Sequence, residues 1–128
     1  MTQRVLVADD DQALQVLLNV LLTRAGFDVD FAHDGKEALT KMTNGDGNGH
    51  PPYAVFMLDL ILPEMSGIEI LAHLQRDNPE LLRRVIVVTS ASRGIIDKVD
   101  VSRIHSLIQK PFDIQDFIRL TSACALQT

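Results

Sequence analysis

Cysteine, long apolar runs and excess positive charge are all scarce in this sequence. Cys124 is the only cysteine, so no disulfide can form within the chain, and nothing points to an oxidising compartment. We expect Cys124 to be a small apolar residue of a terminal helix. No run approaches the roughly 20 apolar residues that span a bilayer, and no signal peptide precedes the first apolar run. We therefore expect a cytoplasmic protein without membrane contacts.

The formal net charge of -5 at pH 7 argues against one class of partner. Binding to nucleic acid through a broad face needs clustered Lys and Arg to neutralise phosphates, so we expect no direct nucleic-acid contact from this domain. The 128 residues suit a single domain over 1–128 with one sizeable core. Whether that domain stands alone or is a fragment of a longer protein stays open.

Short apolar runs alternate with longer amphipathic segments. We expect strands at 5–8, 27–32, 54–58, 85–88 and 104–109. Helices are expected between Asp11 and Gly26, after Gly35, from Ser66 to Asn78, over 93–100 and over 114–126. Five strands in alternation with five helices predict an α/β domain with a parallel sheet covered on both faces. We expect the flavodoxin-like, doubly wound form with strand order 2-1-3-4-5.

Polar side chains follow four of the five expected strands. Asp9 and Asp10 come after the first strand, Asp59 after the third, Thr89 after the fourth and Lys110 after the fifth. Ligands of open α/β sheets bind beyond the carboxyl ends of the strands. We therefore expect these side chains to form one site.

This combination of groups suits a metal ion beside a phosphoryl group. Neighbouring carboxylates repel, and a cation relieves the repulsion. Mg²⁺ takes one or two carboxylates and keeps several waters, and Mn²⁺ is a possible substitute. Lys110 and Thr89 can hold phosphoryl oxygens. Asp59, at the end of the central strand, is then the expected nucleophile for an in-line phosphoryl transfer.

Five stretches, in order along nearly the whole chain, resemble the receiver domains of two-component response regulators. They are Val5-Leu6-Val7-Ala8-Asp9-Asp10, Met57-Leu58-Asp59-Leu60, Pro63-Glu64-Met65-Ser66-Gly67, Val87-Val88-Thr89-Ser90 and Gln109-Lys110-Pro111-Phe112. Each motif is weak alone, and the set is specific. The resemblance implies a phosphoacceptor that catalyses only its own phosphorylation and dephosphorylation, and hence not an enzyme in the usual sense.

The resemblance also implies a role for each site residue. Asp59 would accept a phosphoryl group from a histidine kinase or a histidine phosphotransfer protein. Asp10 and Asp59 would bind Mg²⁺ directly, Asp9 through water, and Ile61 through its backbone carbonyl. Thr89 and Lys110 would hold the phosphoryl oxygens, and a cis bond is expected at Lys110–Pro111. Modification would change contacts with a partner or within a homodimer.

Two departures from the family pattern concern signalling rather than phosphorylation. Leu107 stands where receiver domains often carry Tyr or Phe as a rotating switch residue, and 101–105 replaces the usual Gly-Ala turn. The switch surface of the fourth helix and fifth strand is therefore expected to signal differently from the scheme in which an aromatic residue rotates.

Ile61 and Ala91 flank the expected route of the water that would attack the phosphorylated Asp59. Because Ile61 offers no polar group to that water, we predict slow self-dephosphorylation.

Three alternatives compete with this interpretation. A pseudo-receiver, which would act as an interaction module without phosphorylation, would lack a site residue, and none is missing. An aspartyl-phosphate phosphatase would need an acid two residues after the nucleophile, where this chain has Ile61. The segment 44–49 resembles the start of a calcium loop, but Val55 at its twelfth position cannot ligate. We expect this segment to be a flexible loop.

Overall fold

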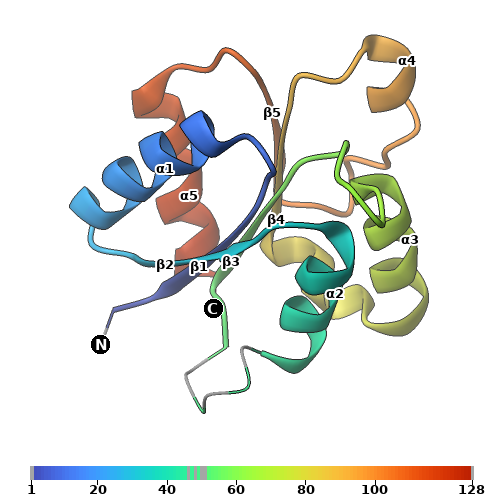
Figure 1. The fold of residues 1–128 in the computed structure, drawn as a ribbon, viewed down its shortest axis with the longest axis horizontal. Helices are drawn as coiled ribbons and strands as arrows, with labels where there is room; N and C mark the ends of the chain where they lie inside the picture. The colour runs from blue at the N-terminus through green and yellow to red at the C-terminus, as the bar shows by residue number, and fades with distance from the viewer. Residues whose placement is uncertain (1, 46, 48, 50–51, 128) are drawn as a thin grey trace.

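The computed structural model describes residues 2–45, 47, 49 and 52–127. A single parallel sheet runs through the centre in the order β2-β1-β3-β4-β5 (Figure 1). The strands are β1 (Arg4–Ala8), β2 (Asp28–Ala32), β3 (Val55–Leu58), β4 (Val85–Thr89) and β5 (Ser106–Gln109). The fold class and strand order expected from the sequence are confirmed.

Helices cover both faces of the sheet. On one face lie α1 (Gln12–Arg24) and α5 (Ile114–Leu126); on the other lie α2 (Gly35–Asn44), α3 (Gly67–Asp77) and the short α4 (Arg93–Ile96) (Figure 1). Side chains of a strand alternate between faces, so Val5 and Val7 of β1 pack towards α1 and α5. Leu6 and Ala8 join the core on the opposite face. Both faces are buried, as uniformly apolar strands require.

Local signals place the helix ends near the expected residues. The Asp11 side chain accepts hydrogen bonds from the backbone N–H groups of Ala13 and Leu14 and so caps α1. The Ser66 hydroxyl accepts from the Glu69 N–H at the start of α3. Gly26, just beyond α1, has φ of 96°, a left-handed conformation that glycine adopts at low cost.

The region from α4 to β5 corrects the sequence interpretation. We expected a helix over 93–100, but α4 ends at Ile96, and turns follow. Gly94 and the β-branched Val99 and Val101 are poor helix formers, which explains the early end. β5 begins at Ser106 rather than 104, because Ile104 is anchored in the core ahead of the ladder.

One further element was not expected from the sequence, and two residue-level expectations have separate outcomes. A 3-10 helix, η1 (Pro79–Arg84), follows α3 and was not expected. In the calcium-like segment 44–49, Asn44 ends α2, whereas Asp46 and Asn48 lie outside the described residues. Cys124 is buried on α5 as expected, and burial raises the pKa of its thiol to about 11. Within the described ranges, no helix is both long enough and apolar enough to cross a membrane.

Candidate functional site

Asp59 lies just beyond β3, at the carboxyl edge of the sheet. Its backbone N–H donates to the Ala8 carbonyl at 3.0 Å, which extends the pairing of β1 and β3 by one residue. The following loop is held by a 2.9 Å hydrogen bond from the Gly67 N–H to the Leu60 carbonyl. A Cβ at Gly67 would lie 2.2 Å from the Asp59 carbonyl oxygen. The start of α3 can therefore approach Asp59 this closely only with glycine at 67.

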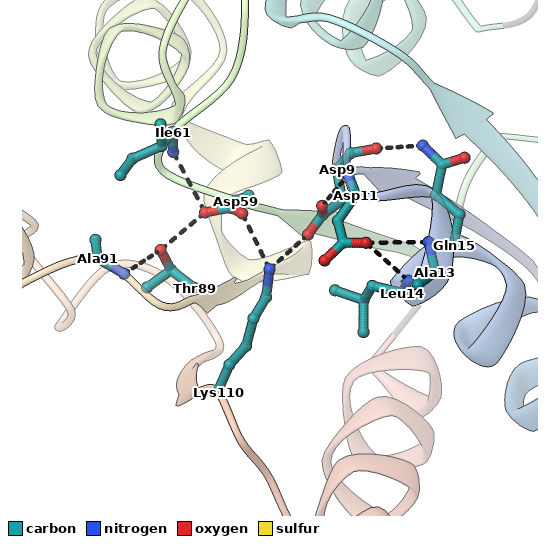
Figure 2. Close-up of polar contacts among 10 residues, drawn as sticks. All are labelled: Asp9, Asp11, Ala13, Leu14, Gln15, Asp59, Ile61, Thr89, Ala91 and Lys110. Atoms are coloured by element: carbon teal, nitrogen blue, oxygen red, sulfur yellow. Dashed lines mark hydrogen bonds and ion pairs between the residues drawn. The ribbon is translucent and has the colours of Figure 1, made fainter.

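The Asp59 carboxylate receives hydrogen bonds on both oxygens (Figure 2). Its Oδ1 accepts from the Thr89 hydroxyl at 2.8 Å and from the Ile61 backbone N–H at 3.3 Å. Its Oδ2 accepts from the Lys110 ammonium at 3.1 Å. Asp59 is only 8% exposed. Donors from its own loop, from β4 and from the segment after β5 thus surround the small accessible part of this carboxylate.

Lys110 bridges Asp59 and Asp9. Its Nζ donates to Asp9 Oδ2 at 2.9 Å, while Asp9 Oδ1 accepts from the Asp11 N–H at 2.9 Å. Burial raises the pKa of the Asp9 carboxyl above its usual value, and the bonds from Asp11 and Lys110 only partly oppose this. For Lys110, burial acts to lower the pKa, but the bond to Asp9 and the charge of Asp59 outweigh it and raise the pKa. Lys110 is therefore a fixed positive charge between two carboxylates.

Thr89 connects the site to the segment that leads into α4. It is fully buried, and its hydroxyl accepts a 3.1 Å hydrogen bond from the Ala91 N–H while donating to Asp59. Leu107, in the neighbouring strand β5, is partly buried and packs against the core on the α2 and α3 face. The Lys110–Pro111 peptide bond is cis, as expected.

The structure brings the side chains of four expected site residues together, whereas the side chains of Asp10 and Ile61 are exposed and take no part in that group. Asp9, Asp59, Thr89 and Lys110 form one hydrogen-bonded group. Asp10 lies next to this group in the chain but is exposed, and no hydrogen bond or ion pair of its carboxylate is recorded among the described residues. Ile61 contributes its backbone, and its side chain is 56% exposed.

The donor set suits a hard cation that remains partly hydrated. In the described part of the chain, no cluster of three or more His, Cys, Asp or Glu side chains could hold a metal ion unaided. Mg²⁺ does not require one, because it binds through one or two carboxylates and keeps several waters. The site offers only oxygen ligands and excess negative charge from Asp9, Asp10 and Asp59. Those residues fit Mg²⁺ better than a metal that needs a complete protein cage.

Sequence reasoning missed two contacts that hold Asp9. The Gln15 side chain, from α1, donates a hydrogen bond to the backbone carbonyl of Asp9 (Figure 2). Gln15 lies six positions after Asp9, among residues whose spacing indicates only an amphipathic helix. No motif marks it. The Asp11 cap was expected, but the bond from the Asp11 N–H to the Asp9 side chain was not.

The fold and the site together define a class: a doubly wound, flavodoxin-like domain with an acidic, lysine-containing site at the carboxyl edge of its sheet. The family model of the response regulator receiver domain matches residues 5–122. The chain therefore belongs to the receiver domain family of two-component response regulators, whose fold is a phosphoacceptor signalling fold rather than that of a conventional enzyme.

Curated relatives are longer than this chain. It is 30% identical over 117 residues to the transcriptional regulatory protein TrcR of Mycobacterium tuberculosis, covering 90% of this chain and 42% of TrcR. It is 31% identical over 129 residues to the DNA-binding dual master transcriptional regulator RpaA of Synechocystis, covering 98% of this chain and 50% of RpaA. The chain thus spans half or less of the length of these relatives.

Solved response regulator structures match nearly the whole chain. The receiver domain of the Francisella response regulator 1452 superposes with a TM-score of 0.80 at 26% identity, covering 98% of both chains. The response regulator protein TrrA of Thermotoga maritima, solved in complex with Mg²⁺-BeF, gives a TM-score of 0.79 at 24% identity and covers 96% of this chain and 99% of TrrA. The second likeness supports the fold.

Proposed function

We propose that this domain accepts a phosphoryl group on Asp59 from a phosphohistidine of a histidine kinase or phosphotransfer protein, in a reaction that depends on Mg²⁺. The modified domain would then change its contacts with a partner or a second copy. The observation that carries the proposal is the convergence of Lys110, Thr89 and the Ile61 N–H on the Asp59 carboxylate. A purely structural ion pair with Lys110 would need neither the Thr89 hydroxyl nor the Ile61 N–H on the same carboxylate.

In the proposed reaction, an Asp59 oxygen attacks phosphorus in line with the leaving nitrogen. A P–O bond forms as the P–N bond breaks, and the imidazole leaves with the electron pair and takes up a proton. Charge spreads over the equatorial phosphoryl oxygens during such transfers. The Lys110 ammonium and the Thr89 hydroxyl, now bonded to Asp59, would donate to those oxygens.

The proposed cation site uses the acidic residues around Asp59. Asp10 and Asp59 would bind Mg²⁺ directly, Asp9 through water, and Ile61 through its backbone carbonyl. When bound, the ion supplies positive charge that offsets the repulsion between carboxylate and phosphoryl group. The Mg²⁺-BeF complex of TrrA, a protein of the same fold, supports this choice of metal.

The exposed face of α1 suits a helical phosphodonor. Val16, Leu17 and Val20 are 66%, 42% and 41% exposed, and they lie on adjacent turns of a helix whose single charged residue is Arg24. Contiguous exposed apolar residues mark interaction sites. Because α1 begins directly after the Asp9–Asp11 turn, a partner that covers this face is close to the proposed phosphoacceptor.

The test is labelling of the purified domain by acetyl phosphate with Mg²⁺. Wild type is expected to acquire one phosphoryl group that alkali and hydroxylamine both remove, as they do from an acyl phosphate, and Asp59→Asn none. Asp116→Asn, which removes an exposed carboxylate on α5, is the matched control and should be labelled like wild type. A wild type that takes no label from acetyl phosphate or from any phosphohistidine donor would instead identify an interaction module without phosphorylation.

A further inference from the structure

Gln15 reaches back from α1 over the turn that joins β1 to α1. Its side-chain amide donates to the Asp9 carbonyl in a partly buried hydrogen bond (Figure 2). β1 ends at Ala8, so the Asp9 carbonyl lies beyond the ladder of the sheet. A side chain, rather than a neighbouring strand, therefore satisfies this carbonyl.

The direction of that carbonyl determines where Asp10 stands. The Asp9 carbonyl belongs to the peptide group that links Asp9 to Asp10, and peptide groups are planar. The Asp9 side chain is fixed independently by the Asp11 N–H and Lys110. Asp10 is exposed, and among the described residues no recorded side-chain contact holds its carboxylate. Two bonds thus orient the backbone from which the Asp10 side chain departs. The Gln15 bond holds the peptide before Asp10, and the bond from the Asp11 N–H to Asp9 holds the peptide after it.

We infer that Gln15 is a positioning residue for the cation site: its amide fixes the Asp9–Asp10 peptide and so holds the Asp10 carboxylate ready to bind a divalent cation. The inference rests on the proposed function for the identity of the cation, Mg²⁺. Groups that orient metal ligands typically contribute about 10-fold to 100-fold to metal affinity. Gln15 does not contact Asp59, Thr89 or Lys110 in any recorded hydrogen bond of the described residues, so its effect should be confined to cation binding.

Two methionine substitutions on the same helix distinguish a role in positioning the cation ligand from a merely structural role. Gln15→Met keeps the length of the side chain and removes the N–H donor. Gln12→Met makes the same change three residues earlier, where the side chain is exposed and makes no recorded contact within the described residues. In the presence of EDTA, Gln12→Met should unfold at the wild-type temperature. Gln15→Met should unfold at a somewhat lower temperature, because a partly buried carbonyl loses its donor.

The primary measurement is an Mg²⁺ titration of the unphosphorylated protein, without phosphodonor, followed by the NMR shifts of the Asp10 and Asp11 amides. We expect the half-saturating Mg²⁺ concentration to rise about tenfold in Gln15→Met and to stay at the wild-type value in Gln12→Met. At saturating Mg²⁺, the rate of labelling by acetyl phosphate should remain within about twofold of wild type, because the transfer groups are unchanged.

Other outcomes overturn the inference. An unchanged half-saturating Mg²⁺ concentration in Gln15→Met contradicts it, as does a wild type whose amides do not respond to Mg²⁺. A lower melting temperature with a lower maximal rate and no change in Mg²⁺ affinity would identify a merely structural role. Failure of the proposed function has a different signature, which is a wild type that binds Mg²⁺ but takes no label. A higher half-saturating Mg²⁺ concentration in Gln15→Met would then still support the inference.

Discussion

Lys110 lies 3.1 Å from the Asp59 carboxylate, although 51 positions separate the two residues in the chain. The same ammonium bonds to Asp9, so one cation offsets two carboxylates that follow different strands. The Lys110 ammonium can therefore shift a hydrogen bond from the Asp59 carboxylate to an incoming phosphoryl oxygen while it keeps its bond to Asp9. This makes Lys110 the most direct test of the proposed transfer.

We predict that Lys110→Met slows labelling by acetyl phosphate about 100-fold, because the variant lacks a charged donor for the transition state. The measurement is the initial labelling rate at saturating Mg²⁺. Lys98→Met, which removes an exposed lysine after α4, is the control and should react like wild type. A Lys110→Met variant as fast as wild type would remove the lysine from the proposed mechanism.

Thr89 should matter both for transfer and for stability. Thr89→Val keeps the shape of the side chain but leaves the buried Ala91 N–H and one Asp59 oxygen without the hydroxyl. Unsatisfied buried groups of this kind cost about 1–3 kcal/mol, so we expect the free energy of unfolding in urea to fall by that amount and labelling to slow.

Thr89→Ser retains the hydroxyl and is the matched comparison. It should label at nearly the wild-type rate. If Val and Ser behave alike in both assays, the hydrogen bonds of the Thr89 hydroxyl contribute nothing measurable.

Ile61 should set the lifetime of the phosphorylated state. Its side chain is exposed beside Asp59 and offers no hydrogen bond to a water that approaches the phosphorus. We predict that Ile61→Asn, whose amide can orient such a water, loses the phosphoryl group several times faster than wild type. The decay of labelled protein after removal of acetyl phosphate measures this, and Ile61→Leu should decay like wild type. Equal decay of Asn and wild type would make the prediction wrong.

The strands and the residues that follow them were accessible from the sequence, since both depend on local signals, whereas the strand order was expected from the fold class. Apolar runs mark the strands, and a polar residue directly after a buried run must emerge at the carboxyl edge. A parallel sheet therefore places Asp59 and Lys110 at the same edge, and the long lysine side chain reaches Asp59 across β4.

Other features depend on tertiary contacts that no local pattern encodes. The Gln15 amide meets the Asp9 carbonyl only because α1 turns back over the end of β1. Residues 97–103 have weak helix propensity, and Ile104 is held in the core, so α4 ends early at Ile96. The contact of Tyr53 with Asp30 likewise joins segments 23 positions apart.

The apolar face of α1 predicts a difference between small and protein phosphodonors. Leu17→Asp places a charge on the exposed face without entering the core, where Leu18 and Leu22 lie. We expect transfer from a phosphorylated histidine phosphotransfer protein that labels wild type to fall about tenfold, as for a central interface residue. Labelling by acetyl phosphate should be unchanged. Thr40→Asp, on the exposed side of α2, is the control; equal loss with both donors would point to damage at the site rather than to docking.

Asp30 predicts how acid affects stability away from the site. Partial burial acts to raise its pKa, but hydrogen bonds from Tyr53 and Lys41 outweigh burial and hold the pKa below the usual 3.8. The native state therefore releases this proton more readily than the unfolded state. The contribution of the carboxylate to the free energy of unfolding is complete above pH 3.8 and is lost as the pH falls through the lower native pKa.

Tyr53→Phe removes one of the hydrogen bonds to Asp30. It should therefore lower the free energy of unfolding by about 1 kcal/mol near neutral pH and by less as the pH approaches the native pKa. Urea unfolding of both proteins across this range measures the difference, and a difference that stays constant in acid would show that Tyr53 stabilises the fold through packing rather than through the Asp30 carboxylate.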